Sequence, residues 1–281
     1  MKKTLFFALA VLLVACCNEE TECTLTILHT NDTHSQILPD SIDHCVGGYA
    51  RRMGLIKQER AIDPDLLLLD AGDFSQGTPY FNYFKGRIEI DAMNRMGYDA
   101  ATLGNHEFDN GLDTLAMVIQ LANFPFVCAN YDFTGTPLEG LVKPYVILER
   151  KHTKIGIFGL GCYPYSVIDD ENFTGITYHE NSYEIAQQMA DTLRSQGCEV
   201  VICLSHQGTK AHANNSNEPH DIEMVPLTRG IDVVIGGHTH EKVTDLNLQN
   251  LDGIETPLRQ MRKKGAYLGK VVLSLSSKKE K

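Results

Sequence analysis

Short apolar runs recur along the chain, and a loop rich in Gly, Asp, Asn and His follows each of them. The runs with their loops read TLTILHTND, DLLLLDAGD, YDAATLGNHEF, PFVCANYD, KIGIFGLGC, EVVICLSHQG and DVVIGGHTH. Helical patterns lie between several of them: YARRMGLIKQERAI, IEIDAMNRMG, DTLAMVIQLAN and SYEIAQQMADTLRSQG. Apolar strands that alternate with helices predict an α/β fold whose parallel strands are buried on both faces. In such a sheet, binding sites form in the loops after the strands.

One domain accounts for most of the chain. The sequence has 281 residues, and 43% of them are hydrophobic, which is enough for a large core. No linker rich in Pro, Gly or Ser interrupts the chain, and the run AYLGKVVLSLS near its end alternates like a last strand. We therefore predict a single globular domain over residues 24–277.

The first 15 residues predict an export signal. Lys2 and Lys3 precede an apolar run from Leu5 to Ala15 that is too short to span a bilayer. The letters LVAC, which end at Cys16, resemble the cleavage box of bacterial lipoproteins; an ordinary signal peptide with an incidental cysteine is the alternative. The resemblance implies a lipoprotein signal peptide at 1–15, lipidation of Cys16 and a tether at 16–23. The protein would then be exported and anchored by lipid to a membrane, in the periplasm or at the outer membrane.

The charge of the chain argues against a nucleic acid polymer as a partner. The formal net charge is -11, and loss of Lys2 and Lys3 with the signal would make it -13. A chain this acidic repels polyanions. A small phosphorylated substrate needs cations at its own site, and such a site can override the bulk charge because the Debye length is about 8 Å at physiological salt.

Eight cysteines form no dense disulfide framework along the sequence. Cys128, Cys198 and Cys203 lie in or beside apolar runs, where a buried free thiol is the expected state.

Ligand-type side chains gather in the loops after five of the predicted strands. Taken alone, each has an ordinary explanation as a turn residue, a helix N-cap or a satisfied imidazole. The histidine pair in GGHTH is more specific, because residues two apart on an extended backbone point to the same side. Together, the loops bring carboxylate, imidazole and amide groups to one sheet edge, and that set suits divalent metal ions. The candidate ligands are Asp32, His34, Asp73, Asn105, His206, His238 and His240.

In this order, the motifs resemble those of the calcineurin-like metallophosphoesterases, and within that family the 5'-nucleotidase branch. The blocks that carry the resemblance are ILHTNDTHS, LLLDAGDFSQGTPYFNYFKG, MGYDAATLGNHEFDNG, SHQG and GGHTH, and the match spans about residues 25–275. The resemblance implies a four-layer α/β/β/α sandwich in which helices flank two mixed sheets. This refines the all-parallel arrangement inferred above.

The resemblance also implies a site for two divalent metal ions, with Zn, Mn, Mg, Ca and Fe as candidates. One ion would be bound by Asp32, His34 and His240, the other by Asn105, His206 and His238, and Asp73 would bridge the two. Many nucleotidases carry glutamine where this chain has His240, which leaves the metal preference of that position open.

His106 follows the candidate ligand Asn105, so its side chain is expected to point away from that metal. The resemblance implies that His106 acts as a general acid, or as an electrostatic stabiliser of the phosphoryl group and its leaving oxygen. Asp109, three residues later, would orient the imidazole and raise its pKa. Asn105 and His106 are also the expected substrate-binding residues, whereas Glu107 is expected to be solvated or structural.

These implications lead to a phosphoesterase that hydrolyses nucleoside 5'-monophosphates or related esters by attack of a metal-bridging hydroxide. The alternatives are a 2',3'-cyclic nucleotide phosphodiesterase, a sugar diphosphate hydrolase, and a weakly active tethered subunit that mainly binds a partner. Full-length bacterial 5'-nucleotidases have a C-terminal domain that stacks the nucleobase, and this chain is expected to stop before it. Either a separately encoded chain supplies that domain, or the protein is a phosphatase of broad specificity.

Overall fold

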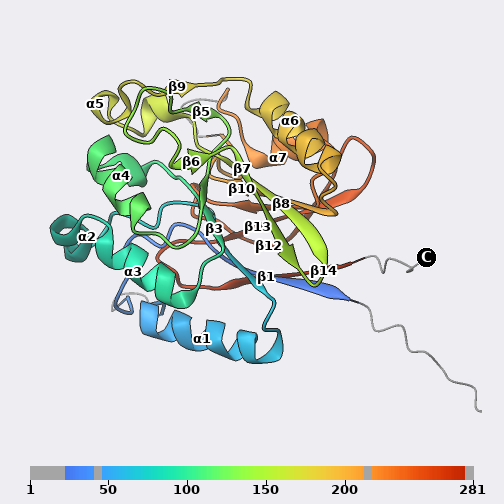
Figure 1. Ribbon diagram of the computed structural model, residues 1–281, viewed down its shortest axis with the longest axis horizontal. Helices are drawn as coiled ribbons and strands as arrows, with labels where there is room; N and C mark the ends of the chain where they lie inside the picture. The colour runs from blue at the N-terminus through green and yellow to red at the C-terminus, as the bar shows by residue number, and fades with distance from the viewer. Residues whose placement is uncertain (1–22, 41–45, 212–216, 276–281) are drawn as a thin grey trace, which may run out of the picture.

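Two six-stranded sheets lie face to face at the centre of the fold (Figure 1). The computed structural model describes residues 23–40, 46–211 and 217–275. In spatial order, the first sheet contains β14 (Gly269–Ser274), β1 (Thr24–Thr30), β2 (Leu67–Asp70), β3 (Ala100–Thr102), β4 (Phe126–Val127) and β6 (Val142–Lys143). The second contains β12 (Lys242–Gln249), β13 (Glu255–Met261), β11 (Val233–Gly236), β10 (Val200–Ser205), β8 (Thr153–Leu160) and β7 (Tyr145–Arg150). A small sheet pairs β5 (Tyr131–Asp132) with β9 (Thr177–Tyr178).

Both large sheets are mixed. In the first sheet, β14 runs antiparallel to β1, whereas the strands from β1 to β6 are parallel to one another. In the second sheet, the edge strands β12 and β7 are antiparallel to their neighbours, and the four strands between them are parallel. The prediction of two mixed sheets is therefore confirmed, and the all-parallel arrangement inferred from the apolar runs alone is wrong at the sheet edges.

Helices cover the outer face of each sheet. The α-helices are α1 (Tyr49–Ile62), α2 (Pro79–Phe84), α3 (Arg87–Met96), α4 (Leu112–Gln120), α5 (Asp170–Phe173), α6 (Ser182–Ser195) and α7 (Asp221–Met224). The described ranges also contain the short 3₁₀ turns η1 (His106–Phe108), η2 (Pro164–Ser166) and η3 (Val225–Leu227). Apolar residues of α1, α3 and α4 pack on the first sheet, and those of α6 and α7 pack on the second. The order of layers is thus helix, sheet, sheet, helix (Figure 1).

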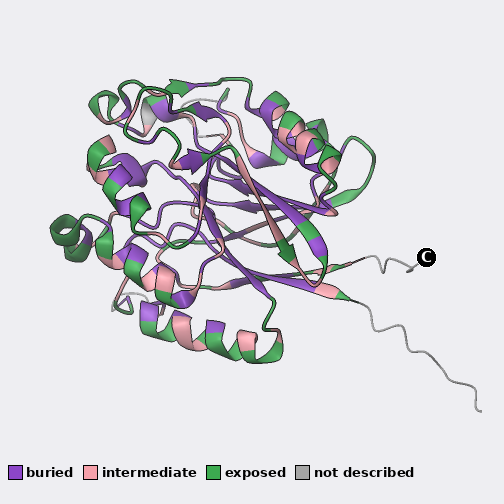
Figure 2. Ribbon diagram, in the orientation of Figure 1, coloured by how far each residue is buried: buried purple, intermediate pink, exposed green. Residues whose placement is uncertain are grey.

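The central strands are buried on both faces, as their apolar runs predict (Figure 2). In β10, Val200, Ile202 and Leu204 face the other sheet, while Val201 and Cys203 face the helices on the outside. This division follows from the two-residue period of a strand. One apolar core therefore lies between the sheets, and another lies under each helical layer.

The carboxyl ends of the parallel strands in each sheet lie at one edge. The last residue of β1, Thr30, pairs with the last residue of β2, Asp70, and Ser205 at the end of β10 pairs with Gly236 at the end of β11. The loops that carry the candidate ligands all leave the sheets from such ends. The topology thus explains why residues far apart in sequence can meet.

The predicted signal peptide at 1–15 and the lipidation site Cys16 lie outside the described residues, as does all of the tether except Cys23. None of the helices in the described ranges combines the length and the apolar character that a membrane crossing requires. The cysteines of the described ranges are all free, and burial of Cys128, Cys198 and Cys203 confirms the prediction made for them.

Candidate metal centre

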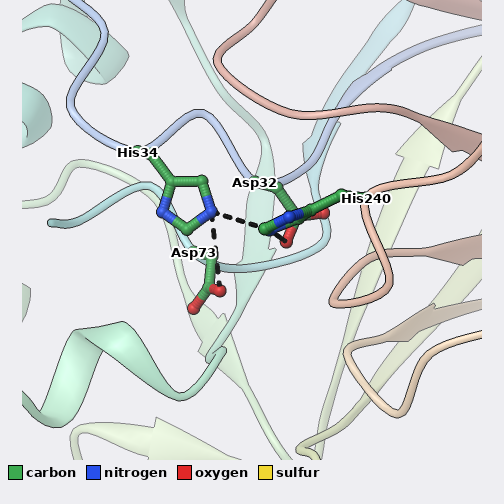
Figure 3. Close-up of side chains that lie close together, drawn as sticks. All are labelled: Asp32, His34, Asp73 and His240. Atoms are coloured by element: carbon green, nitrogen blue, oxygen red, sulfur yellow. Dashed lines mark hydrogen bonds and ion pairs between the residues drawn. The ribbon is translucent and has the colours of Figure 1, made fainter. Parts of the chain in front are cut away.

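Asp32, His34, Asp73 and His240 form the first cluster of candidate ligands (Figure 3). Each offers a ligand atom, and these atoms all lie within 4.8 Å of one another. The two histidines face each other with 2.9 Å between their Nε2 atoms. His240 Nε2 lies 3.4 Å from Asp32 Oδ1, and His34 Nε2 lies 4.0 Å from Asp73 Oδ2. The loops after β1, β2 and β11 supply these side chains, so both sheets contribute to the cluster.

A second cluster shares Asp73 with the first and adds His206 and His238. His206 Nε2 lies 3.1 Å from Asp73 Oδ2. His238 Nδ1 lies 3.0 Å from the side-chain oxygen of Asn105. All seven predicted ligands are therefore brought together in two groups around Asp73, which is the arrangement that the resemblance implies. Metal binding by each residue stays a prediction.

The backbone at these positions is unusual. Five of the seven candidates have left-handed backbone angles, with φ of 48° at Asp32, 44° at His34, 56° at Asp73, 74° at His238 and 57° at His240. Residues other than glycine rarely adopt this conformation, and such residues cluster at functional sites where surrounding contacts hold them. Here the loops after β1 and β2 hold each other, because Asp32 N donates to Gly72 O at 2.9 Å and His34 N donates to Asp73 O at 3.0 Å.

Three glycines leave room for the ring of His206. A Cβ atom on Gly72 or Gly237 would lie 2.8 Å or 2.7 Å from His206 Nδ1, and one on Gly104 would lie 2.7 Å from His206 Nε2. All three distances are shorter than real Cβ contacts. Gly72, Gly104 and Gly237, which belong to the motifs DAGD, LGNHEFDNG and GGHTH, thus have a packing role at the site.

The polar atoms of His206 fit a metal ligand. Its Nδ1 lies 2.6 Å from the carbonyl oxygen of Ala71, which can only accept, so Nδ1 carries the hydrogen. Nε2 is buried and has no hydrogen-bond partner of good geometry within the described ranges. A histidine held by a backbone carbonyl in this way presents Nε2 to a metal.

The buried carboxylate of Asp73 favours a positive charge beside it. Burial would raise the pKa of Asp73, but the charges of His206, His34 and His106 hold that pKa well below its usual range. Burial opposes a charge on His206, yet the carboxylate of Asp73 raises the pKa of His206 to about 10. The pKa of His34 is lowered, chiefly by burial. In the protein alone a proton supplies the positive charge beside Asp73, and a divalent ion there would satisfy the same carboxylate together with neutral imidazoles.

His106 and Asp109 are in contact. His106 Nδ1 lies 2.9 Å from Asp109 Oδ2, and the backbone N of His106 donates to Asp73 Oδ1 at 2.9 Å. Burial lowers the pKa of His106, but the hydrogen bond to Asp109 and the charges of Asp73 and Asp109 raise it, and the net shift is upward. The imidazole centroid lies 5.3 Å from that of His34, so the ring borders the first cluster. The orientation predicted for Asp109 is present, and the catalytic role of the pair stays a prediction.

Asn105 begins a helical turn and also faces the second cluster. It is the N-cap residue of η1, but its side chain makes no capping hydrogen bond. Its amide oxygen faces His238 instead. The short turn therefore directs the side chain of Asn105 toward the second cluster, whereas the ring of His106 contacts Asp109 and borders the first cluster.

Glu107 is structural and not solvated, which was one of the two roles expected for it. The residue is buried, and its carboxylate accepts hydrogen bonds from the backbone N atoms of Asp73, Ser75 and Gly104 at 2.9, 3.0 and 2.7 Å. It therefore joins the loops after β2 and β3. In the sequence, Glu107 is only an acidic residue two positions after the candidate ligand Asn105, and nothing in the neighbouring residues distinguishes it from a solvated one.

Known proteins resemble this chain over most of its length. A family model described as calcineurin-like phosphoesterase matches residues 25–242. A snake venom 5'-nucleotidase from Naja atra is 35% identical over 279 residues, which cover 90% of this chain and 51% of that protein. The 5'-nucleotidase of Bos taurus is 33% identical over 280 residues, which cover 90% of this chain and 47% of that protein. The chain thus spans about half the length of the curated relatives it matches.

Solved structures show the same fold. A 5'-nucleotidase precursor from Thermus thermophilus superposes with a TM-score of 0.75 at 28% identity, over 90% of this chain and 55% of that chain. The calcineurin-like phosphoesterase YfkN from Bacillus subtilis superposes with a TM-score of 0.77 at 29% identity, over 92% of this chain and 87% of that chain. These likenesses confirm the predicted α/β architecture of two mixed sheets between helices.

Proposed function

Because the chain belongs to the calcineurin-like phosphoesterase family, we propose that it is a metal-dependent hydrolase of phosphate esters, with nucleoside 5'-monophosphates as its leading substrates. The observation that carries the proposal is the grouping of seven ligand-type side chains in two clusters that share Asp73. The choice of nucleotides rests on the 5'-nucleotidases among its relatives.

In this proposal Asp32, His34 and His240 hold one divalent ion, Asn105, His206 and His238 hold a second, and Asp73 contacts both. When bound, the two ions supply a local charge of about +2 after the two aspartates are counted, and they activate water for attack on a phosphorus atom. The donor set of oxygen and nitrogen, without thiolate, suits hard or borderline ions. A phosphate dianion is then attracted to the site although the whole chain is acidic.

In this proposal His106, which Asp109 orients, donates a proton to the leaving oxygen or stabilises the negative charge of the phosphoryl group. Asp109 holds Nδ1 of the imidazole, so Nε2 is the atom that is free to donate to a phosphoryl or leaving oxygen. About 30% of the His106 side chain is exposed, so a bound ester can reach it. The hydrogen bond from His106 N to Asp73 Oδ1 ties this residue to the carboxylate that both clusters share.

Nucleobase recognition, in this proposal, comes from a separately encoded chain, and the lipid on Cys16 anchors the protein to a membrane. The support for a domain beyond the matched region is that this region accounts for only 51% and 47% of the two curated relatives. The support for the anchor is the sequence LVAC after an apolar run. A purely binding subunit is the weaker alternative, because His106 with Asp109 beside two ligand clusters has no use in a protein that only binds.

Phosphate release from a panel of substrates tests the proposal. The panel contains nucleoside 5'-monophosphates, 2',3'-cyclic nucleotides, nucleotide sugars and a simple sugar phosphate, each assayed with Mn²⁺ and with a chelator. We expect metal-dependent release, fastest from the 5'-monophosphates, and none from Asp73→Asn. Faster turnover of a cyclic or sugar nucleotide would replace the substrate assignment, and no release from any ester would refute hydrolysis. A repeat with the products of neighbouring reading frames added tests the two-chain arrangement.

A further inference from the structure

Glu89 is a buried acid outside every motif of the sequence. It lies in the first turn of α3, and none of its surface is exposed. Ser35 donates its hydroxyl hydrogen to Glu89 Oε1, whereas Oε2 has no hydrogen-bond partner in the part of the chain that the structure describes. A buried carboxylate that is incompletely paired is unfavourable for stability. The role of Glu89 therefore depends on the hydrogen bond that its Oε1 accepts from Ser35.

Glu89 holds the turn that carries two candidate metal ligands. Ser35 has a φ of 51°, and with Asp32 and His34 it is the third left-handed residue among four consecutive ones. Residues other than glycine keep this conformation only where several contacts fix it. The conformation of this turn determines where the Asp32 carboxylate and the His34 imidazole lie.

The contacts that fix the turn come from two sides. On one side, backbone bonds join it to the loop after β2, and the last of these is Ser35 N to Phe74 O at 2.8 Å. On the other side, the Ser35 hydroxyl meets Glu89 of α3 and lies 2.7 Å from Thr78 Oγ1 at the start of α2. Thr78 Oγ1 also lies 3.2 Å from Ser35 O, which it can donate to. The side chain of Ser35 thus ties the turn to the helical layer.

We propose that Glu89 is a positioning residue of the metal centre: through the hydroxyl of Ser35, it holds the left-handed turn that directs Asp32 and His34 toward the first metal ion. The inference rests on the metal ligands proposed above, but not on any particular substrate. Ser35 gives its one hydroxyl hydrogen to Glu89 Oε1, so its oxygen can only accept toward Thr78, whose single hydrogen is within reach of both Ser35 Oγ and Ser35 O.

The acceptor at position 89 is the property that matters, and this separates three variants. Glu89→Gln keeps an oxygen that can accept from Ser35. Glu89→Ala removes the acceptor, and Ser35→Ala removes the hydroxyl, with its contacts to both Glu89 and Thr78 Oγ1. Asp232→Ala is a control at another acidic residue: Asp232 accepts hydrogen bonds from Val201 N and from Arg194, both at 2.6 Å, but precedes β11 and so lies at the opposite end of the parallel strands.

Titration calorimetry of the full chain with Mn²⁺, and separately with Zn²⁺, measures metal affinity without any assay of hydrolysis. We expect Glu89→Ala and Ser35→Ala to weaken one of two binding events by about 10- to 100-fold, the range for loss of a group that orients a metal ligand. Glu89→Gln should bind close to wild type, Asp232→Ala should leave affinity unchanged, and the double variant Glu89→Ala/Ser35→Ala should be no weaker than Ser35→Ala alone.

Three results would overturn the inference: unchanged affinity in Glu89→Ala, a Glu89→Gln variant as weak as Glu89→Ala, or additive losses in the double variant. If Glu89→Ala does not fold, Ser35→Ala decides the question, because it removes one oxygen. A wild-type protein that binds no metal would refute the proposed metal centre and this inference together. A wild type that binds two ions, with variants that match it, would refute this inference alone.

Discussion

Gly104 lies against two of the candidate ligands, and any side chain there must displace them. A Cβ atom on Gly104 would lie 2.2 Å from Asp73 Oδ1 and 2.7 Å from His206 Nε2. Neither side chain can move without leaving its position in the second cluster. We predict that Gly104→Ala lowers the affinity for divalent ions by at least the roughly 10- to 100-fold seen when orienting groups are lost. Titration with Mn²⁺ measures the change.

Gly54 provides the control for this substitution. It lies within α1, and a Cβ atom there would meet nothing within 4 Å. Gly54→Ala should bind metal as the wild type does, and it should be more stable by about 0.5–1 kcal/mol because alanine favours a helix. If Gly104→Ala binds metal equally well, Asp73 and His206 are not ligands in the positions described.

His106 is predicted to be required for turnover but not for metal binding. Its ring is held by Asp109, and the residue belongs to neither cluster of candidate ligands in the described ranges. His106→Ala should lower kcat by about 10²- to 10⁴-fold, the usual range for a general acid, while metal content measured by elemental analysis stays at the wild-type value. Asp109→Asn should cause a smaller loss, because the imidazole remains. Full turnover in His106→Ala would remove it from the mechanism.

The candidate ligands could be predicted from the sequence because each lies within a short local motif that ends a strand. Glu107 and Glu89 could not, for a physical reason. Glu107 accepts hydrogen bonds from residues 32 and 34 positions away, and Glu89 meets Ser35 across 54 positions. Such contacts leave no periodic or local signal, and an acidic residue in a first turn is ordinarily a surface residue favoured by the helix dipole.

At the scale of the element, η1 joins two loops of the first sheet through Glu107. Loss of its carboxylate leaves three backbone N–H groups without the acceptor they now have, and each unsatisfied buried group costs about 1–3 kcal/mol. We predict that Glu107→Ala lowers the free energy of unfolding by at least about 3 kcal/mol, measured by urea denaturation. Glu107→Gln, which keeps one acceptor oxygen, should fall between that variant and the wild type. A loss below about 1 kcal/mol in Glu107→Ala would show that water replaces the carboxylate.

The strands with the weakest apolar patterns were the ones that the sequence did not predict. β12 reads KVTDLNLQ and is largely exposed, and β13 reads ETPLRQM and contains Pro257. β12 is an edge strand, where one side meets solvent, and β13 lies between β12 and β11. The resemblance therefore supplied only the mixed character of the sheets, whereas buried strands such as β2, β10 and β11 followed from their own residues.

At the scale of the molecule, the candidate ligands connect the two sheets. Asp32, His34, Asp73 and Asn105 leave the first sheet, and His206, His238 and His240 leave the second. Ions held by both sets bind only the folded chain, so they should stabilise it by about 2.7 kcal/mol at a free concentration 100 times Kd. We predict that a chelator lowers Tm and that Mn²⁺ restores it. Asp73→Asn should show a much smaller restoration, and an equal one would place the ions elsewhere.

The free energy of unfolding should depend on pH through a buried carboxyl group of α7, which packs on the second sheet. Asp221 is fully buried at the start of α7, where Ser205 donates to its Oδ1, and Oδ2 has no hydrogen-bond partner in the described ranges. Burial raises the pKa of Asp221 from about 3.8 to about 7, although the Ser205 hydrogen bond and the charge of His206 oppose the rise. The folded protein therefore keeps this proton up to about pH 7, whereas the unfolded chain releases it near pH 4.

Between these values the folded state binds more protons than the unfolded state, so the stability contributed by Asp221 is full below about pH 4 and is lost as pH rises to about 7. Asp221→Asn stays neutral throughout and keeps an oxygen that can accept from Ser205. We predict that the difference in free energy of unfolding, variant minus wild type, rises by up to about 4 kcal/mol between pH 4 and pH 8, since one pKa unit corresponds to about 1.36 kcal/mol. Urea denaturation at both pH values measures the difference, and it cancels the other titrating groups. Asp191→Asn on α6, which is exposed, should give no such rise, and a flat difference for Asp221→Asn would mean that Asp221 is ionised in the folded protein.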